Sequence, residues 1–170
     1  DPNIGRSISL WPHGVLYRDS EADMRRAMIE ADLVECVIGL GPNLFYNSPM
    51  EACLLITKTN KSADRKGKIL FINAVKEVKQ EKTMSFLDKH HVNKIFKAYQ
   101  DFKSQENFAA LMSTEEVLQN KGNMAISLYV QPKKEDGSAV LPFEASYKNW
   151  VESSSKLKQS MDDLFQTLEN

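Results

Sequence analysis

Residues 34–57 read VECVIGLGPNLFYNSPMEACLLIT, two apolar runs separated by a stretch rich in turn-forming residues. Both runs, 34–40 and 52–57, are almost continuously apolar, which is typical of strands covered on both faces of a sheet. Between them, two asparagines, a serine and two prolines favour a loop over a helix. The stretch therefore predicts a buried sheet, with the adjacent aromatic residues Phe45 and Tyr46 in a loop between two of its strands.

The neighbouring segments extend this prediction to an α/β fold. Residues 7–12 (SISLWP) predict a short strand that proline ends, and a cap at Asp19 or Ser20 begins a helix that reaches about Ala31. Another buried strand, 69–74 (ILFINA), follows a polar loop. A strand, a helix and further buried strands in this order are typical of the closing part of an α/β sheet, which we expect to be an incomplete parallel sheet. No glycine-rich turn follows any strand, so the dinucleotide-binding fingerprint is absent.

The second half predicts a smaller α+β segment. Residues 87–103 form an amphipathic helix with Asp88 as its cap, and a short strand then precedes a helix that the capping box Ser113–Glu116 opens and Gly122 ends. Residues 126–130 (ISLYV) predict one more strand. The expected organisation is an α/β part at 1–75, an extension of helices and short strands at 76–132, a linker at 133–142 and a long helix at 143–170.

The final helix carries an apolar seam. Its members recur at alternating spacings of four and three residues, interrupted only by Ser154: Phe143, Tyr147, Trp150, Leu157, Met161, Leu164 and Leu168. This a/d pattern is typical of coiled-coil packing. A helix of roughly 27 residues is about 40 Å long, too long to bury its whole seam on so small a body. Docking to a partner is the preferred interpretation, and an ordinary core helix is the alternative.

Composition limits the classes of function. The net charge of −1 lacks the basic character of a self-sufficient nucleic-acid-binding domain, so any DNA contact is local or shared with a partner. Cys36 and Cys53 lie in apolar runs and predict buried, reduced thiols, as in a cytoplasmic protein. No run approaches the roughly 20 apolar residues of a membrane span, and no signal peptide is evident. The chain begins with aspartate rather than methionine, which suggests a fragment.

Three further features resemble chemical sites, but the sequence favours other interpretations of them. His90 and His91 point about 100° apart on a helix and lack further ligands, so a solvated helix start is preferred and no metal is expected. The loop between the predicted strands at 52–57 and 69–74, called the basic loop below, contains Lys58, Lys61, Arg65, Lys66 and Lys68. We expect it to be a solvated linker, and phosphate binding is the weaker alternative. The amino-terminal Asp1-Pro2-Asn3 is not an adenine-methyltransferase tetrapeptide, because Ile4 stands where an aromatic ring must stack on the base.

Several segments, in order along nearly the whole chain, resemble the modification (M) subunit of type I restriction–modification systems. They are GRSISLWPHGVLYR, RRAMIEADLVECVIGLGPNLFYNSPMEACLLI, RKGKILFINA, HVNKIFKAYQDF and FAALMSTEEV, with NMAISLYV as a looser match. That subunit is an S-adenosylmethionine-dependent adenine-N6 DNA methyltransferase. The resemblance implies the closing part of a Rossmann-like catalytic sheet. The family's cofactor-binding and catalytic motifs precede the PHGVLYR-like strand, so the resemblance implies a carboxy-terminal fragment with no catalytic or cofactor-binding residue of its own.

The resemblance also implies residue roles and partners. It implies that the NLFY-like loop helps to hold the flipped adenine, so we expect Phe45 to face the base and Tyr46 to form the rim, with Phe45 as a plug of the core as the alternative. Pro12 and His13 follow the carboxyl end of a strand, where α/β sheets place ligands, and are expected to line the same crevice. The seam, especially Tyr147, Trp150, Leu157, Met161, Leu164 and Leu168, would join the specificity (S) subunit, which selects the DNA sequence. The restriction (R) subunit and double-stranded DNA complete the expected partners, and S-adenosylmethionine binds the full subunit only. A non-enzymatic interaction module, with the sheet supporting a docking helix, is the alternative hypothesis.

Overall fold

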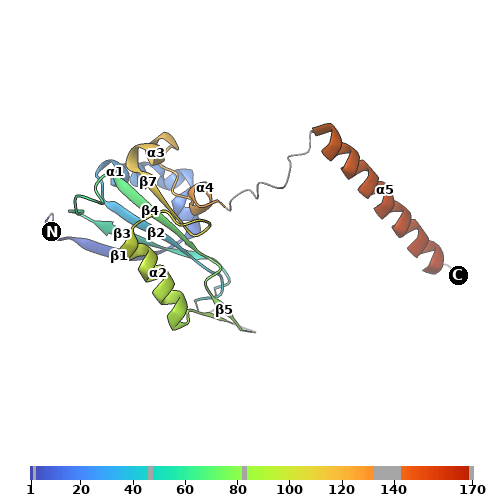
Figure 1. Ribbon diagram of the computed structural model, residues 1–170, viewed down its shortest axis with the longest axis horizontal. Helices are drawn as coiled ribbons and strands as arrows, with labels where there is room; N and C mark the ends of the chain where they lie inside the picture. The colour runs from blue at the N-terminus through green and yellow to red at the C-terminus, as the bar shows by residue number, and fades with distance from the viewer. Residues whose placement is uncertain (2, 46–47, 82–83, 132–142, 169–170) are drawn as a thin grey trace. The chain divides into compact units, whose positions relative to one another are not determined.

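Five strands form a mixed sheet in the order β1–β3–β2–β4–β7 (Figure 1). They are β1 (Arg6–Pro12), β2 (Val34–Leu40), β3 (Ala52–Lys58), β4 (Lys68–Ala74) and β7 (Ala109–Ser113). The strands predicted over 7–12, 34–40, 52–57 and 69–74 are confirmed to within one residue, and so is the short strand of the second half. Every residue of β2 is buried, as expected for a strand covered on both faces.

The computed structural model describes residues 1, 3–45, 48–81, 84–131 and 143–168. The chain divides into two compact units, Asp1–Lys133 and Lys134–Asn170. The first contains the sheet, the short helices η1 (His13–Leu16) and η2 (Asp19–Glu21), the helices α1 (Ala22–Glu30), α2 (Lys89–Asp101), α3 (Thr114–Gln119) and α4 (Ile126–Tyr129), and a small hairpin of β5 (Lys79–Gln80) and β6 (Ser85–Phe86). The second contains α5 (Phe143–Leu168). No helix in the described part is long and apolar enough to cross a membrane.

The expectation of a parallel sheet was wrong, because β2 and β4 are the one parallel pair among the strands that the structure describes. β3 lies between β1 and β2 and runs antiparallel to both, and β7 is antiparallel to β4. The reason lies in the connection from β2 to β3. Parallel neighbours need a crossover of about a dozen residues or more, usually through a helix, whereas a short loop returns the chain antiparallel.

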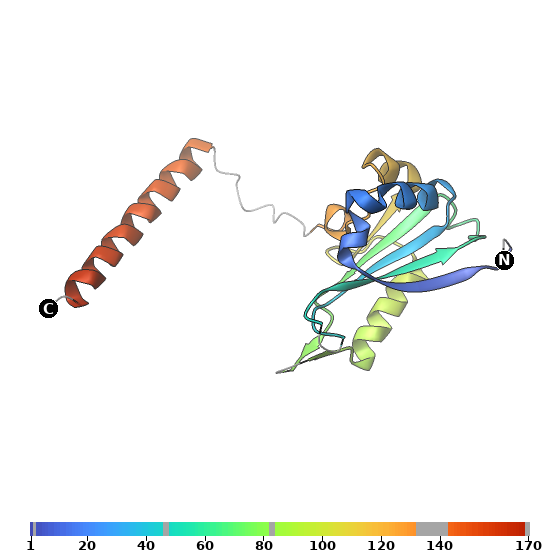
Figure 2. The same ribbon diagram turned by 180° about the vertical axis from the view of Figure 1, so that it is seen from behind.

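Helices cover both faces of the sheet and create two apolar cores. Figures 1 and 2 show α1, α3 and α4 on one face and α2 on the other. The core on the α1 face is centred on buried side chains such as Val37, Leu55 and Phe71, and the ring of Tyr129 stacks on Phe71 at 4.3 Å between centroids. The core on the α2 face gathers Ile38, Leu70, Ile95 and further residues. A sheet buried on two sides explains the nearly continuous apolar runs of its central strands.

Two local predictions were wrong. Residues 126–129 form the short helix α4 rather than a strand, because the Asn123 side chain accepts a hydrogen bond from the Ala125 backbone N–H at 2.8 Å and turns the chain. Neither Asp19 nor Ser20 caps α1. Both lie in η2, where the Ser20 hydroxyl donates to the Glu21 carboxylate, and α1 begins without a side-chain cap.

The predicted caps of the later helices are confirmed. Asp88 is the N-cap of α2, and the imidazole Nδ1 of His91 accepts a hydrogen bond from its backbone N–H at 3.1 Å. His91 thus takes the place that glutamate or glutamine holds in an ordinary capping box, and it is buried rather than part of a solvated helix start. Ser113 and Glu116 cap α3 reciprocally, and Gly122 follows with a positive φ of 66°.

The basic loop is pinned to the sheet, so the solvated-linker interpretation was wrong for two of its cations. The ammonium of Lys61 is buried 2.6 Å from the Asp32 carboxylate. The Arg65 guanidinium lies 2.6 Å from the Glu35 carboxylate and 4.3 Å from the centre of the Phe102 ring. These contacts hold the loop between β3 and β4 against the amino end of β2. Lys61 and Arg65 are therefore engaged in structure and are not available to bind phosphate.

Both cysteines are buried free thiols, as predicted. Burial raises the pKa of Cys53 to about 11, and it raises the pKa of Cys36 well above its ordinary value. Because thiolate is the reactive species, each should react with Ellman's reagent at pH 8 roughly 100-fold or more slowly than an exposed cysteine of ordinary pKa. Labelling in native buffer and in concentrated guanidinium chloride measures this difference. Rapid stoichiometric labelling of the native chain would contradict it.

Candidate functional site

The carboxyl ends of three strands lie at the same end of the sheet, called the carboxyl edge below. β1 and β2 run in the same direction, since both are antiparallel to β3, and β4 is parallel to β2. Their last residues, Pro12, Leu40 and Ala74, therefore lie along this edge. Sheets of α/β proteins commonly bind ligands at the carboxyl ends of their strands. Of the sequence-predicted residues, Pro12 is the last residue of β1, His13 follows it directly, and Phe45 lies in the connection after β2.

A cavity of about 640 Å³ opens at this edge, and His13 is one of its lining residues. The imidazole Nδ1 lies 3.4 Å from the Glu51 carboxylate, and Nε2 is buried without a hydrogen-bond partner among the described residues. Gly39 makes room for this arrangement. A Cβ on Gly39 would lie 2.8 Å from the Ile126 side chain and 3.5 Å from His13 Nε2. The structure thus places His13 in a cavity whose shape depends on a glycine in β2.

Phe45 lies elsewhere along the same edge. Its side chain is half-buried and packs against the core on the α2 face, and its carbonyl accepts a hydrogen bond from the Ser48 backbone N–H at 3.0 Å. Phe45 does not line the cavity of His13. Tyr46 lies outside the described residues, and Pro12 is exposed at the end of β1. The structure brings these residues to one edge but does not join Phe45 and His13 in one cavity.

Several polar residues of the cavity were missed by sequence reasoning. Glu51 precedes β3, Asn73 belongs to β4, and Lys94 comes from α2, where its ammonium pairs with Glu77 and lies 4.5 Å from the centre of the Phe108 ring. Asn73 alone gave a signal, because it is the single polar residue in the apolar run ILFINA. The others come from distant segments, and only the sheet order and the position of α2 bring them together.

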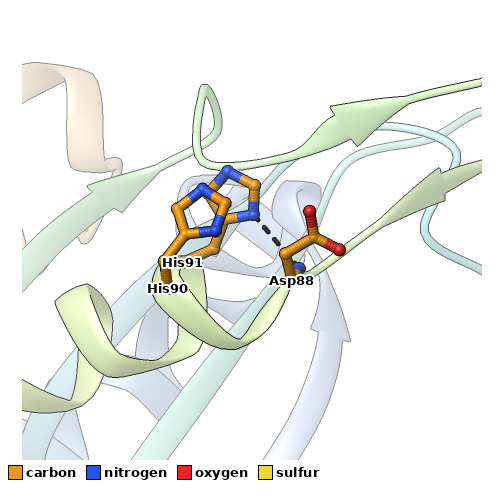
Figure 3. A group of neighbouring side chains, drawn as sticks. All are labelled: Asp88, His90 and His91. Carbon is orange, nitrogen blue, oxygen red and sulfur yellow. Dashed lines mark hydrogen bonds between the residues drawn. The ribbon is translucent and has the colours of Figure 1, made fainter.

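Asp88, His90 and His91 form the one group of three or more potential metal ligands in the described part of the chain (Figure 3). One ligand atom from each lies within 4.8 Å of the others. The prediction that the two imidazoles diverge was wrong, because their ring centres are 3.8 Å apart. The Nδ1 atom of His91, however, already accepts the backbone N–H of Asp88. This hydrogen bond gives the cluster a structural role at the start of α2.

The described side chains of the α5 seam are exposed within their own unit. Tyr147, Trp150, Leu157 and Met161 all lie on the surface, and the rings of Tyr147 and Trp150 are 6.0 Å apart. The side chains of Leu164 and Leu168, also predicted for the seam, lie outside the described part. The apolar stripe is thus present on a helix that begins at Phe143, as the sequence predicted, and its partner stays a prediction.

Comparison with known proteins assigns the sequence to a family. The sequence model of the N-6 DNA methylase family matches residues 2–138. The chain is 39% identical over 127 residues to the type I restriction enzyme MjaVIII methylase subunit of Methanocaldococcus jannaschii, covering 72% of this chain and 22% of that protein. It is 32% identical over 173 residues to the MjaIX methylase subunit of the same organism, covering 96% of this chain and 30% of that protein.

Solved structures agree with this result. The fold resembles the methyltransferase subunit of a type I restriction–modification system from Streptococcus thermophilus, with a TM-score of 0.70 and 33% identity over 75% of this chain and 27% of that one. The M protein of the type I enzyme EcoKI shares the fold at a TM-score of 0.58 and 15% identity, covering 95% of this chain and 41% of that one. The chain spans less than a third of the two curated relatives described above. On this evidence, the chain belongs to the N-6 DNA methylase family.

Proposed function

We propose that this chain is the closing part of the catalytic domain of an S-adenosylmethionine-dependent adenine-N6 DNA methyltransferase, the M subunit of a type I restriction–modification complex. The family match over residues 2–138 carries the proposal. The sheet supports it, because β1 pairs with β3 alone among the described strands and leaves its other edge open. In the complete subunit, the remaining strands of a Rossmann-like sheet pair with this edge of β1.

The loops at the carboxyl edge form one wall of the pocket for the flipped adenine. Phe45 faces the base, Tyr46 forms the rim, and Pro12 and His13 line the adjoining crevice. Two observations support this role: the connections that follow β1 and β2 leave the same end of the sheet, and Phe45 is only half-buried. An aromatic face can stack on any base, which suits a pocket that must hold an unpaired adenine.

Truncation of Phe45 to alanine in the full-length gene product should selectively weaken capture of the target adenine. Loss of one stacked ring costs about 1–3 kcal/mol, which corresponds to roughly 5- to 150-fold in the rate of methylation at limiting DNA. Phe86→Ala, which truncates another partly exposed aromatic side chain on β6, is the matched control. A large loss of thermal stability in Phe45→Ala, without a selective defect in methylation, would show that Phe45 is a core residue instead.

The cofactor binds outside these 170 residues. The sequence has no glycine-rich turn after a strand and no catalytic tetrapeptide, so the chain alone should show no S-adenosylmethionine binding by calorimetric titration. The full-length gene product is the positive control. Micromolar binding by the 170-residue chain would contradict the division of roles proposed above.

Assembly depends on α5. Its exposed seam, described above, docks on helices of the specificity subunit, and the complex also includes the restriction subunit and double-stranded DNA. The exposed seam equally favours a second candidate function, a non-enzymatic interaction module in which the sheet only supports α5. Methylation of DNA by the full-length gene product together with the specificity subunit decides for the methyltransferase, and its absence from a folded complex decides for the module.

A further inference from the structure

An apolar strip remains uncovered on the α2 face of the sheet. Ile8 and Leu10 of β1 are opposite Ile56 and Leu54 of β3, so all four side chains point to the face that α2 covers. Ile56 is buried and Leu54 half-buried, whereas Ile8 and Leu10 are 63% and 51% exposed. Among the described residues of the first unit, none covers the outer part of this face.

The strip continues onto one flank of α2. Ile95 and Ala98 face the core, and Lys94 reaches toward Phe108, next to the β7 side of the sheet. Val92 and Phe96 lie about 160° around the helix from Lys94, which directs them toward β3 and β1. They are 47% and 55% exposed. Exposed apolar side chains on α2 and β1 thus border the same part of the sheet.

The uncovered part of the sheet beside α2 is wide enough for one additional helix. Strands in a sheet are about 4.8 Å apart and an α-helix with its side chains is about 10 Å wide, so one helix covers roughly two strands. α2 makes its main strand contact with β4, and Ile56 of β3 is already buried in the same core. The space beside α2 therefore lies over Leu54 of β3 and over β1, about the width of one helix.

We propose that an amphipathic helix of the same subunit, from the part of the polypeptide beyond these 170 residues, packs between α2 and β1 on Ile8, Leu10, Leu54, Val92 and Phe96. This inference rests on the proposed function. The strip is continuous with the open edge of β1, where the rest of the subunit adds its strands, and most of the length of the relatives lies outside the matched region. A segment that pairs with β1 therefore brings its helices next to this strip, whereas a second copy of the chain would have to compete with it.

Thiol labelling tests the proposal, because both native cysteines are buried and are expected to react slowly. Leu10→Cys and Phe96→Cys are introduced separately into the 170-residue chain and into the full-length gene product. Both positions should react at least about tenfold more slowly in the full-length protein. Leu128→Cys, at a partly exposed leucine of α4 on the other face, is the control and should react equally in both.

Equal labelling of Leu10→Cys and Phe96→Cys in both proteins would overturn the proposal, and so would protection in the 170-residue chain that increases with its concentration, which indicates a second copy. A methylation assay on the same full-length samples separates the two proposals. An active enzyme with unprotected cysteines refutes the docked helix and leaves the proposed function intact. Protected cysteines in a folded protein that never methylates DNA refute the proposed function and support the helix.

Discussion

Aspartate at both Leu157 and Met161 should abolish co-purification of the full-length gene product with the specificity subunit. Both side chains lie on the exposed seam of α5, Leu157 being 64% exposed. If assembly buries the seam, two carboxylates there lose their hydration, at a cost of several kcal/mol. At about 1.4 kcal/mol per tenfold, the affinity should fall by more than 100-fold. Pull-down with a tagged specificity subunit measures the loss.

The matched control places the same charges on the opposite side of α5. Ser155→Asp with Gln159→Asp has the same four-residue spacing, but both positions lie about 160° around the helix from Leu157. This variant should assemble normally. Circular dichroism should show the same fold for both variants, because α5 belongs to a unit separate from residues 1–133. If the seam variant unfolds the whole chain, α5 is a core helix and the docking role is wrong.

Replacement of Arg65 by methionine should destabilise the first unit by about 3–5 kcal/mol, the usual cost of leaving one member of a buried ion pair alone. Glu35 is only 1% exposed, and one of its oxygens has no partner among the described residues even with Arg65 present. Without Arg65, the Tyr99 hydroxyl at 3.2 Å is the one hydrogen-bond partner that the carboxylate keeps among the described residues. Burial, and then the charge of Glu35, raises the pKa of Tyr99, so this hydroxyl stays protonated. The melting temperature should fall by roughly 10–20 °C.

The double variant Glu35→Leu with Arg65→Met should recover most of this loss, because an apolar pair leaves no charge buried without a partner. Thermal and urea unfolding, followed by circular dichroism, measure both variants. A cost below about 1 kcal/mol for the single variant would show that water reaches Glu35. A double variant as unstable as the single one would show that packing of Arg65 on Phe102, rather than charge, holds the loop.

Strand positions were predictable from sequence because burial on two faces leaves a local signature. The apolar runs at 34–40 and 52–57 predicted the positions of two strands, and the capping residues Asp88 and Ser113 predicted where two helices begin. Strand direction was not predictable in the same way. The direction of β3 depends on the connection that follows β2. A buried strand has the same apolar sequence pattern whether its neighbour is parallel or antiparallel. The helix at 126–129 was missed because a short apolar run does not distinguish a strand from a buried turn of helix.

The candidate site was predictable only in part. His13 could be placed at the edge because it directly follows a strand that proline ends, and the structure puts it in a cavity. Its partner Glu51 is 38 positions away and carries no local pattern, so only the fold reveals the pair. In the basic loop, sequence reasoning missed a structural role. Lys61 and Arg65 look like surface charges in the sequence, and their acidic partners, Asp32 and Glu35, lie in a segment about 30 residues earlier.

The open edge of β1 has a consequence for how such an enzyme could be divided. Every strand pairing of the five-stranded sheet forms within residues 6–113, and the β3 side of β1 is already satisfied. A break in the polypeptide just ahead of β1 therefore severs no hydrogen bond of this sheet. It leaves a fragment with its own two cores, which could associate with the remaining, longer fragment along a single strand. For the proposed methyltransferase, the topology thus makes this point a natural position for a split enzyme, in which two separately made fragments restore activity by complementation.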